Sequence, residues 1–439
     1  MDHARSTDPA VQAQLDRLTA LSPGADVLGL SRIQALCDRL GNPERRLPPV
    51  FHVAGTNGKG STCAFLRAAL EAEGYGVHAY TSPHLVRFNE RIRMAGTLIE
   101  DAALAPLLAR VLDIAGDLGA SFFEVTTAAA FLAFAEVPAD ACVIEVGLGG
   151  RLDATNIVVN PAACGIAQLG IDHQAFLGNT IDAIAREKAG IAKPGRPLVT
   201  LDYGDEVNDV VGRVAMAAGA PIRVHGTDWG HGANATLAKV FHDWPAGSGT
   251  FMTAWPALHG EHQVGNLALA VAMLRSQDRV PVSQQAMKAA ALAARWPARM
   301  QRLSPGPLVD LVPAGTAVWL DGGHNPAAAA AVAAALAETT AEPLHLILGM
   351  LANKDAAGFL APIAPQAASL TAVPVPDHDH HAPASLAALG RSLGIESDVA
   401  TDLPAALHAV AQRPAGSVAI LGSLYLAGEA LRQNDERPD

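Results

Sequence analysis

The sequence predicts an α/β protein in which short buried strands alternate with longer helices. Short apolar runs are separated by helical windows of about 10–15 residues, a spacing typical of βαβ units and a parallel sheet. The runs are almost continuously apolar, as expected when helices cover both faces of a sheet. The alternation degrades near residue 226 and restarts after residue 299. We therefore expect two domains, over residues 1–295 and 296–439.

In the first domain, apolar runs predict five strands and longer windows predict helices between them. The predicted strands are Val50–Ala54, Val77–Thr81, Ala141–Val146, Ala163–Leu169 and Leu198–Leu201. The predicted helices are Ser61–Glu73, Leu104–Leu118, Val125–Ala135, Asp205–Ala217, His262–Ser276 and Ser283–Ala294. Gly, Asn, His and Trp are scattered between residues 226 and 257, which predicts a small β excursion or a loop region. Together these elements predict a mostly parallel sheet.

The second domain repeats the alternation on a smaller scale. The segment Arg295–Arg299 contains a proline and breaks helical periodicity, so we expect a linker there. The predicted strands are Ala317–Asp321, Leu344–Gly349, Ser369–Val373 and Val418–Leu421, and the predicted helices are Pro326–Ala337, Ala384–Leu393 and Pro404–Val410. This pattern predicts a smaller Rossmann-like α/β domain.

Composition narrows the class of protein. Hydrophobic residues make up 50% and charged residues 17% of the 439 residues, which excludes a disordered or collagen-like chain. A net charge of −12 argues against nucleic acid as the main partner. Cys37, Cys63, Cys142 and Cys164 form no CxxC pair, so we expect buried thiols in a reducing compartment. The polar N-terminus and the lack of an apolar span predict a cytoplasmic protein with no membrane partner, and we expect a monomer.

The strongest local signal is the segment His52–Thr62, which reads HVAGTNGKGST and lies between a predicted strand and a predicted helix. Its glycines allow backbone N–H groups to surround an anion, and Lys59 supplies a positive charge for phosphates. The start of the following helix adds to the positive field. The spacing departs from GxxxxGK[ST], because Gly60 separates Lys59 from Ser61. The alternative is a glycine-rich turn before a helix. The context favours a nucleotide phosphate loop and a phosphate-loop ATPase-type domain.

Oxygen-bearing and basic side chains follow several other predicted strands. Glu145 lies at the end of a predicted buried strand. From the carboxyl end of a strand in a parallel sheet, a carboxylate can reach a bound ligand. The alternative is a helix-capping or structural role. Ser82 follows another strand and is by itself an ordinary turn serine. His173 follows a third, where a packed or surface histidine is the usual interpretation. Carboxylate and hydroxyl oxygens suit Mg²⁺. Lys188 lies in what could simply be a charged helix that ends at Gly190.

Seven motifs resemble the folylpolyglutamate synthase and dihydrofolate synthase family. They are GTNGKGST at Gly55–Thr62, TSPHL at Thr81–Leu85, ERIR at Glu90–Arg93, EVGLGGRLDATN at Glu145–Asn156, EKAGI at Glu187–Ile191, LDGGHNP at Leu320–Pro326 and GMLANKD at Gly349–Asp355. They occur in the family's order. The family is one of the ATP-dependent ligases that also include the Mur enzymes of peptidoglycan synthesis.

The resemblance implies roles for individual residues. ATP would contact Thr56, Asn57, Gly58, Lys59, Gly60, Ser61, Asn266, Arg299 and Asp321, with His324 and Asn325 nearby. Ser82 and Glu145 would bind one Mg²⁺, and His173 a second. Lys188 would be carbamoylated by CO₂, because a carbamate is a hard oxygen ligand whereas an ammonium would be repelled by two Mg²⁺ ions. The residues expected to act in catalysis are Lys59, Lys188, His173 and His324.

The resemblance also implies a pterin-binding region. Its residues would be Ser121, Phe122, Phe123, Glu124, Leu152, Asp153 and Ala154. The stretch Asp26–Leu30 resembles a segment that helps form the dihydropteroate pocket, although its leucines could equally be ordinary core residues. Two departures from the family pattern stand out. Gly322 and Gly323 replace bulkier residues, which predicts a looser backbone there, and Val125-Thr126 follows the Phe-Glu pair.

The implied reaction joins L-glutamate to dihydropteroate and to the γ-carboxylate of reduced folates. ATP would first convert the carboxylate to an acyl phosphate, which the glutamate amine then attacks. One alternative is a folylpolyglutamate synthase without the first activity. A Mur-type ligase is disfavoured because too few residues precede Gly55 for a UDP-binding domain. A phosphate-loop ATPase switch would leave the LDGGHNP motif unexplained. The cluster Asp377–His381 could be mistaken for a metal site, but we expect a solvated loop.

Overall fold

The computed structural model describes residues 5–21, 28–237, 239–243 and 250–439. The chain divides into two compact units. The first comprises Met1–Ala257 and Gln263–Arg295, and the second comprises Leu258–His262 and Trp296–Asp439. The short Leu258–His262 segment, which the sequence placed in the first domain, therefore packs with the second unit.

The first unit is built on an eight-stranded sheet in the order β4-β3-β2-β5-β1-β6-β7-β8. Its strands are β1 (Val50–Ala54), β2 (Val77–Tyr80), β3 (Ile92–Met94), β4 (Thr97–Leu98), β5 (Ala141–Glu145), β6 (Ala163–Ile166), β7 (Leu198–Thr200) and β8 (Ile222–Val224). The strands from β2 to β8 across the sheet run parallel, and β3 and β4 extend the β2 edge antiparallel. The mostly parallel sheet is thus confirmed, with β1 in its middle and buried along its whole length.

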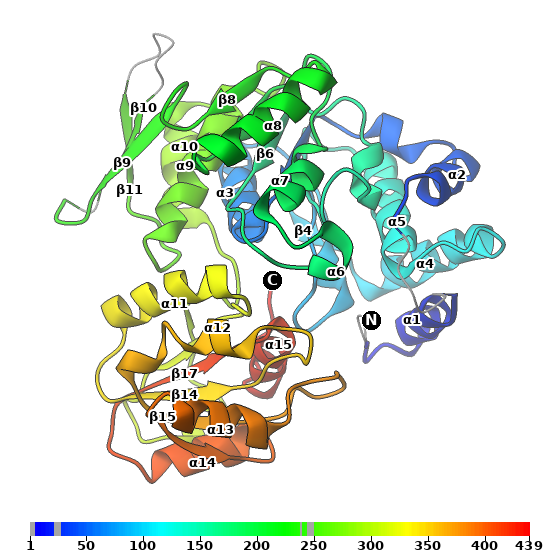
Figure 1. Cartoon of the computed structure of the whole chain (residues 1–439). Coiled ribbons are helices and arrows are strands. Elements are labelled where there is room, and N and C mark those ends of the chain that lie inside the picture. The colour runs from blue at the N-terminus through cyan, green and yellow to red at the C-terminus, as the bar shows by residue number, and fades with distance from the viewer. Residues whose placement is uncertain (1–4, 22–27, 238, 244–249) are drawn as a thin grey trace. The chain divides into compact units, whose positions relative to one another are not determined.

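Helices flank this sheet, and a small separate sheet completes the first unit. The helices are α1 (Pro9–Leu21), α2 (Ser31–Arg39), α3 (Lys59–Ala72), α4 (Asp101–Ala115), α5 (Phe122–Glu136), α6 (Gln174–Leu177), α7 (Ile181–Ala189), α8 (Asp205–Ala218), α9 (His262–Arg275) and α10 (Gln284–Ala293), with short 3₁₀ turns η1 (Pro43–Arg46), η2 (Phe88–Arg91) and η3 (Ala154–Ile157). The small antiparallel sheet holds β9 (Gly230–Asn234), β10 (Lys239–Asp243) and β11 (Phe251–Ala254). Figure 1 shows α1, α2, α4 and α5 gathered on one side of this unit and the small sheet at its opposite margin.

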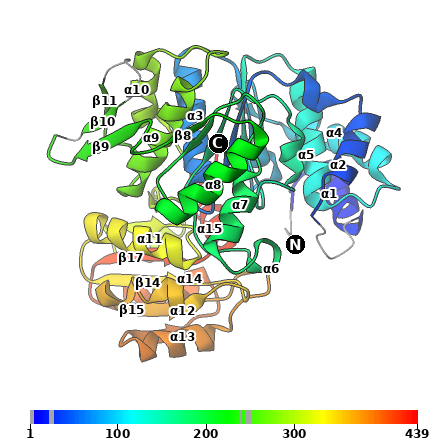
Figure 2. The same cartoon turned by 45° about the horizontal axis from the view of Figure 1, so that its top comes forward.

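The second unit is a six-stranded sheet in the order β12-β13-β17-β14-β15-β16, parallel apart from the short β12. Its strands are β12 (Gln301–Arg302), β13 (Val318–Leu320), β14 (Leu344–Leu348), β15 (Ala367–Ala372), β16 (Glu396–Val399) and β17 (Ser417–Leu421). Its helices are α11 (Pro326–Thr339), α12 (Ala356–Leu360), α13 (Pro383–Ser392), α14 (Leu403–Ala411) and α15 (Leu424–Gln433), with 3₁₀ turns η4 (Val309–Leu311) and η5 (Ala364–Gln366). In Figure 2, α11 and α13 are seen on opposite sides of these strands.

Burial of apolar side chains holds each unit together. In the first unit, one large cluster joins α1, α2, α4 and α5 to the sheet, and a second cluster lies beneath α7 and α8. The second unit has its own core around α11, β14 and β15. All four cysteines are buried free thiols, as predicted. Within the described ranges, no helix is both long enough and apolar enough to cross a membrane.

Several elements were not predicted, and each lacks an obvious apolar run. In α1, only Val11, Leu15 and Leu18 are buried, so three apolar positions on one face stand among polar residues. The edge strand β16 has polar, mostly exposed residues, and β8 is short and half-exposed. Edge strands are solvated along one side, so the apolar signal that identifies a central strand is absent from them. The region after residue 226 is indeed a small β excursion.

Candidate functional site

The predicted phosphate loop connects β1 to α3 in the centre of the first unit's sheet. Gly55 and Gly58 both have positive φ values, of 148° and 82°. A Cβ on Gly55 would lie 2.9 Å from the Ala167 Cβ, and one on Gly58 would lie 2.4 Å from the Asn266 Oδ1. Only glycine fits at these two positions. The loop ends at Lys59, the first residue of the 14-residue α3, so the positive end of that helix lies at the loop.

Hydrogen bonds to the segment Gln168–Gly170, and one within the loop itself, fasten this loop. The backbone N–H groups of Thr56 and Asn57 donate to the Gln168 carbonyl oxygen, over 2.7 and 3.2 Å. The Thr56 hydroxyl donates to the Gly170 carbonyl oxygen over 2.9 Å. The Lys59 Nζ donates to the Thr56 carbonyl oxygen over 3.2 Å, so its ammonium is folded over the loop. These hydrogen bonds hold the loop in this conformation, a form of preorganisation that favours phosphate binding.

Asn266, predicted to contact ATP, lies against the same loop although it is far away in the sequence. It is buried near the start of α9, and its Nδ2 donates to the Gln263 Oε1 over 3.0 Å. Its Oδ1 is the atom that occupies the space beside Gly58. The fold thus brings together two of the segments that the sequence assigned to nucleotide binding.

Glu145 and Ser82 meet at the carboxyl ends of two adjacent strands. Glu145 is the last residue of β5 and pairs in register with Val53 of β1, so it is level with the start of the phosphate loop. The Ser82 backbone N–H donates to the Glu145 Oε2 over 3.2 Å. A carboxylate and a hydroxyl-bearing residue in contact supply the hard oxygen donors that Mg²⁺ prefers. The residues present therefore fit a magnesium ion at this edge.

His173, unlike the buried Glu145, lies in an exposed loop. It precedes α6 with a positive φ of 52°, and its side chain is exposed. Among the residues that the structure describes, no group of three or more His, Cys, Asp or Glu side chains could hold a metal ion. A metal ion bound by any of these side chains would therefore take further ligands from hydroxyl groups, water or a nucleotide. The role of His173 toward a second Mg²⁺ stays a prediction.

Lys188 is a buried amine beneath the phosphate loop. Its side chain comes from α7, the residue is only 4% exposed, and its Nζ donates to the Gly55 carbonyl oxygen over 2.9 Å. Burial, followed by the nearby positive charge of Lys59, lowers the pKa of Lys188 to about 7. Much of this amine is therefore uncharged near neutral pH. An uncharged amine is the form that reacts with CO₂, so the environment suits the expected carbamate.

The loop after β5 is packed tightly onto the end of α7. A Cβ on Gly150 would lie 2.7 Å from the Glu187 carbonyl oxygen. The Arg151 backbone N–H donates to that same oxygen over 2.8 Å, and the Arg151 guanidinium pairs with the Glu187 carboxylate at 2.8 Å. These contacts fix the position of the turn of α7 that carries Lys188.

The predicted pterin segments also lie at this loop. A Cβ on Gly147 would lie 2.4 Å from the Phe123 Cζ, so the Phe123 ring packs on bare backbone. Glu124 and Ser121 form a capping box at the start of α5, and the Arg32 Nε donates to the Glu124 Oε2 over 3.0 Å. The Arg91 guanidinium lies 5.5 Å from the Phe122 ring centroid.

The second pterin segment, Leu152–Ala154, closes the same loop. Asp153 is buried, and its Oδ2 accepts a hydrogen bond from the Leu148 N–H over 2.8 Å. Burial raises the pKa of its carboxyl group. Leu152 is half-buried, and Ala154 begins η3. Of the Asp26–Leu30 stretch, residues 26 and 27 lie outside the described residues, and Leu30 packs against the core. The two pterin segments thus share one loop, and their role stays a prediction.

In the second unit, Arg299 and Asp321 are neighbours. Asp321 is 4% exposed, and its carboxylate accepts hydrogen bonds from the Met300 N–H over 2.8 Å and the Gly323 N–H over 2.7 Å. Ala298 and Met300, on either side of Arg299, have positive φ values of 54° and 41°. Non-glycine residues are costly in this region, and such strain is typical of functional segments.

The LDGGHNP motif is more closely packed than the sequence suggested. A Cβ on Gly322 would lie 2.3 Å from the Leu424 Cδ2, and one on Gly323 would lie 2.9 Å from the Asp321 Oδ1. The expectation of a looser backbone is therefore wrong, because these glycines make room for neighbours. The His324 Nδ1 is 2.9 Å from the Gly322 carbonyl oxygen, and Asn325 caps α11.

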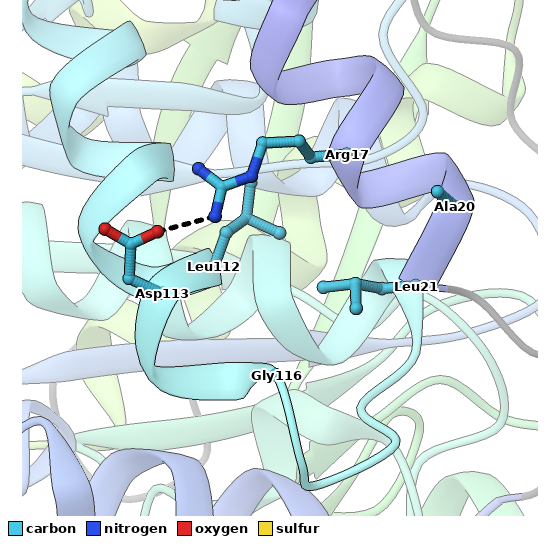
Figure 3. Close-up of a pocket in the computed structure, with 6 residues that line it drawn as sticks. All are labelled: Arg17, Ala20, Leu21, Leu112, Asp113 and Gly116. Carbon is cyan, nitrogen blue, oxygen red and sulfur yellow. Dashed lines mark hydrogen bonds and ion pairs between the residues drawn. The ribbon is translucent and has the colours of Figure 1, made fainter.

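The histidine-rich loop Asp377–His381 and a surface hollow are two further features, and neither contains a residue predicted to act in binding or catalysis. His380 and His381 fasten the histidine-rich loop to Leu351 and Lys354, and Asp377 and Asp379 are exposed. A hollow of about 480 Å³ lies between α1 and α4 on the first unit (Figure 3). It is lined by Arg17, Ala20, Leu21, Leu112, Asp113 and Gly116. None of the residues predicted to act in binding or catalysis lines this hollow, so we do not assign the reaction to it.

Sequence reasoning missed several polar residues of the first unit that are buried or half-buried. The Lys193 Nζ donates to the Asn156 Oδ1 over 2.8 Å, and the Asn156 Nδ2 donates to the Arg151 carbonyl oxygen over 2.9 Å. His52, within β1, is fully buried. A histidine inside an otherwise apolar central strand was a usable signal, because such a side chain needs a buried partner.

Comparisons with known proteins identify the family to which the chain is similar. Residues 299–424 match the family described as Mur ligase, glutamate ligase domain. The chain is similar to the dihydrofolate synthetase of Saccharomyces cerevisiae, at 33% identity over 92% of this chain and 97% of the relative. It is 34% identical to the folylpolyglutamate synthase of Lacticaseibacillus casei, over 92% and 93% of the two chains.

A solved structure extends the likeness to three dimensions. It is a bifunctional folylpolyglutamate synthase/dihydrofolate synthase with Mn, AMPPNP and L-glutamate bound, 30% identical to this chain. The TM-score is 0.84, over 97% of this chain and 99% of the other. The phosphate loop, the Ser82–Glu145 edge and a similarity that extends over nearly the whole chain lead to one conclusion. The chain belongs to the dihydrofolate synthase and folylpolyglutamate synthase family.

Proposed function

We propose that the protein is an ATP-dependent ligase that joins L-glutamate to dihydropteroate and to the γ-carboxylate of reduced folates. The observation that carries this proposal is the grouping of Lys59, Glu145, Ser82 and Lys188 around one phosphate loop. The curated relatives are named for one or the other of these two activities, and the solved relative is named for both.

The chemistry of ligation explains why these groups are needed. A carboxylate is a poor electrophile, so it must first be converted to an acyl phosphate, which the glutamate amine then attacks with loss of phosphate. The Lys59 ammonium and the N-terminus of α3 would neutralise charge on the phosphoryl group during its transfer. A Mg²⁺ ion held by Ser82 and Glu145 would supply further neutralisation when bound. We propose that Lys188 acts as its carbamate and that His173 binds a second Mg²⁺.

The remaining predicted residues would bind the substrates or act in catalysis. We propose that Asn266, Arg299 and Asp321 contact the nucleotide and that His324 acts in catalysis. The aromatic rings of Phe122 and Phe123 would suit a flat pterin, which gains from aromatic contact and area burial. We expect a cytoplasmic monomer that binds ATP, L-glutamate and folates.

The test is to supply the purified protein with ATP, Mg²⁺ and L-glutamate together with either dihydropteroate or tetrahydrofolate. Product masses should show dihydrofolate in the first reaction and a tetrahydrofolate longer by one glutamate in the second. A protein that extends tetrahydrofolate but leaves dihydropteroate unchanged would be a folylpolyglutamate synthase alone. ATP hydrolysis that is equally fast without the carboxylate and glutamate would refute a ligase.

A further inference from the structure

His52 is a fully buried polar residue in the central strand of the first unit. It belongs to β1, whose other residues are apolar or lead into the phosphate loop, and it is 0% exposed. Its Nε2 lies 2.8 Å from the Thr155 Oγ1. Burying an imidazole costs free energy unless a hydrogen bond offsets its desolvation. A valine or leucine would satisfy packing at this position, so packing alone does not explain a histidine.

The hydrogen bonds around Thr155 have a defined direction. The Thr155 hydroxyl donates to the Asp153 Oδ1, and the Thr155 backbone N–H donates to the same oxygen over 3.0 Å. A hydroxyl has a single hydrogen, so toward His52 it can only accept. The hydrogen between His52 and Thr155 must therefore be on the His52 Nε2. The His52 Nδ1 has no hydrogen-bond partner among the described residues, as suits a bare lone pair.

The charge state of His52 agrees with this assignment. Burial, followed by the nearby positive charge of Lys193, lowers the pKa of His52 to about 3. The ring is therefore neutral at neutral pH and has one N–H to donate. Its single N–H lies on the side of Thr155.

The last member of this chain of hydrogen bonds, Asp153, closes the loop that follows β5. Its Oδ1 accepts from Thr155, and its Oδ2 accepts from the Leu148 N–H over 2.8 Å. The carboxylate thus joins the two ends of the segment 148–155. Phe123 packs on Gly147, immediately before this segment. A change in the orientation of Asp153 would therefore alter the backbone on which Phe123 packs.

We propose that His52 is a positioning residue that acts through Thr155 to orient the Asp153 carboxylate, and thereby shapes the loop that receives the acid substrate. The inference rests on the proposed function, because the loop is assigned to the pterin end of that substrate. His52 itself does not touch the reacting groups.

The first experiment compares Thr155→Val with Thr155→Ser in the full-length protein. Valine has the shape of threonine but no hydroxyl, whereas serine keeps the hydroxyl. Thr155→Val should raise the KM for dihydropteroate about 10-fold and leave kcat and the KM for ATP within about 3-fold. Thr155→Ser should keep the KM for dihydropteroate within about 3-fold of the wild-type value. An unchanged KM in Thr155→Val, or an equal rise in both variants, would overturn the proposal.

A second pair of variants tests His52 itself. His52→Met removes the donor and should raise the KM for dihydropteroate as Thr155→Val does. The double variant should be no worse than the poorer single variant, because both changes break the same chain of hydrogen bonds. If the KM increases of the two single variants multiply in the double variant, His52 and Thr155 act separately and the proposal is refuted.

A matched control comes from another buried His–Thr pair in the same unit. The His242 Nε2 lies 3.1 Å from the Thr253 Oγ1 in the small sheet. Thr253→Val removes the same kind of hydrogen bond but should leave the KM for dihydropteroate unchanged. If it raises that KM as much as Thr155→Val, the effect is general destabilisation and the proposal fails.

Nuclear magnetic resonance of the wild-type protein separates this inference from the proposed function. The ¹⁵N shifts of the His52 ring should show a hydrogen on Nε2, whether or not the protein ligates glutamate. A hydrogen on Nδ1 would overturn the relay even in an active enzyme. A wild-type protein with the expected tautomer that does not ligate glutamate to either acceptor would refute the proposed function instead.

Discussion

Replacing Lys188 should make the unliganded protein more stable and at the same time inactive. In the folded chain the pKa of Lys188 is about 7, against an ordinary value of 10.5. This difference corresponds to about 5 kcal/mol. The full amount opposes folding below pH 7, where the lysine is protonated in both the unfolded and the folded chain. The hydrogen bond to the Gly55 carbonyl oxygen offsets part of this cost.

The sign follows from proton linkage. The unfolded chain binds more protons than the folded chain between pH 7 and 10.5, so stability rises with pH across that window. At pH 6 nearly the whole cost of about 5 kcal/mol opposes folding, and at pH 9 about 2 kcal/mol remains. Lys188→Met removes this contribution. Its advantage over the wild type should therefore be about 2.5 kcal/mol larger at pH 6 than at pH 9.

Urea unfolding at the two pH values, in buffer free of Mg²⁺ and depleted of CO₂, measures this difference. Lys188→Arg is the control, because arginine keeps its charge across the range and should destabilise the fold at both pH values. If the stability difference between Lys188→Met and the wild type is the same at pH 6 and pH 9, the lysine is not the buried, weakly basic amine that the structure describes. Ligase activity of Lys188→Met near the wild-type level would refute its proposed role.

Three further predictions concern the same unit. Lys59→Ala should fold normally and lose ligase activity on the order of 10²-fold or more, and turnover near the wild-type level would contradict its role in phosphoryl transfer. Glu145→Gln and His173→Ala should each raise the Mg²⁺ concentration needed for activity, and unchanged Mg²⁺ titrations in both would exclude them as ligands. The lowered pKa of His52, about 3 against 6.5, means that the wild type should lose stability relative to His52→Met as the pH falls from 6.5 toward 3, by up to about 5 kcal/mol. Equal acid sensitivity of the two proteins in circular dichroism would contradict this.

The central strands and the phosphate loop could be predicted because their signals are local. The run Val50–Ala54 is apolar apart from His52 and matches β1 residue for residue. Gly55 and Gly58, which follow this strand, have positive φ values. Because glycine adopts such values readily, a glycine-rich segment directly after a strand is a local signal for a loop of this kind. The contact of Ser82 with Glu145 could also be anticipated, because both follow strands that end at one edge of a parallel sheet.

The parts that could not be predicted depend on contacts between distant segments. Nothing near Asn266 in the sequence shows that it lies beside Gly58, and nothing near His52 shows that it reaches Thr155. The same is true of the packing of Gly322 on Leu424, which reversed the expectation of a loose backbone. These contacts follow from strand order and register, which a single sequence does not specify.

The contact between Asn266 and Gly58 has a consequence for synthesis on the ribosome. At about 5–20 residues per second, the roughly 200 residues between them take on the order of 10–40 s to be made. During that interval the nascent chain has β1, α3 and Lys59 but lacks α9, so one wall of the phosphate loop is missing. Nucleotide captured by a stalled chain should therefore bind weakly until α9 has emerged, and ATP would not be expected to assist the earliest stages of folding.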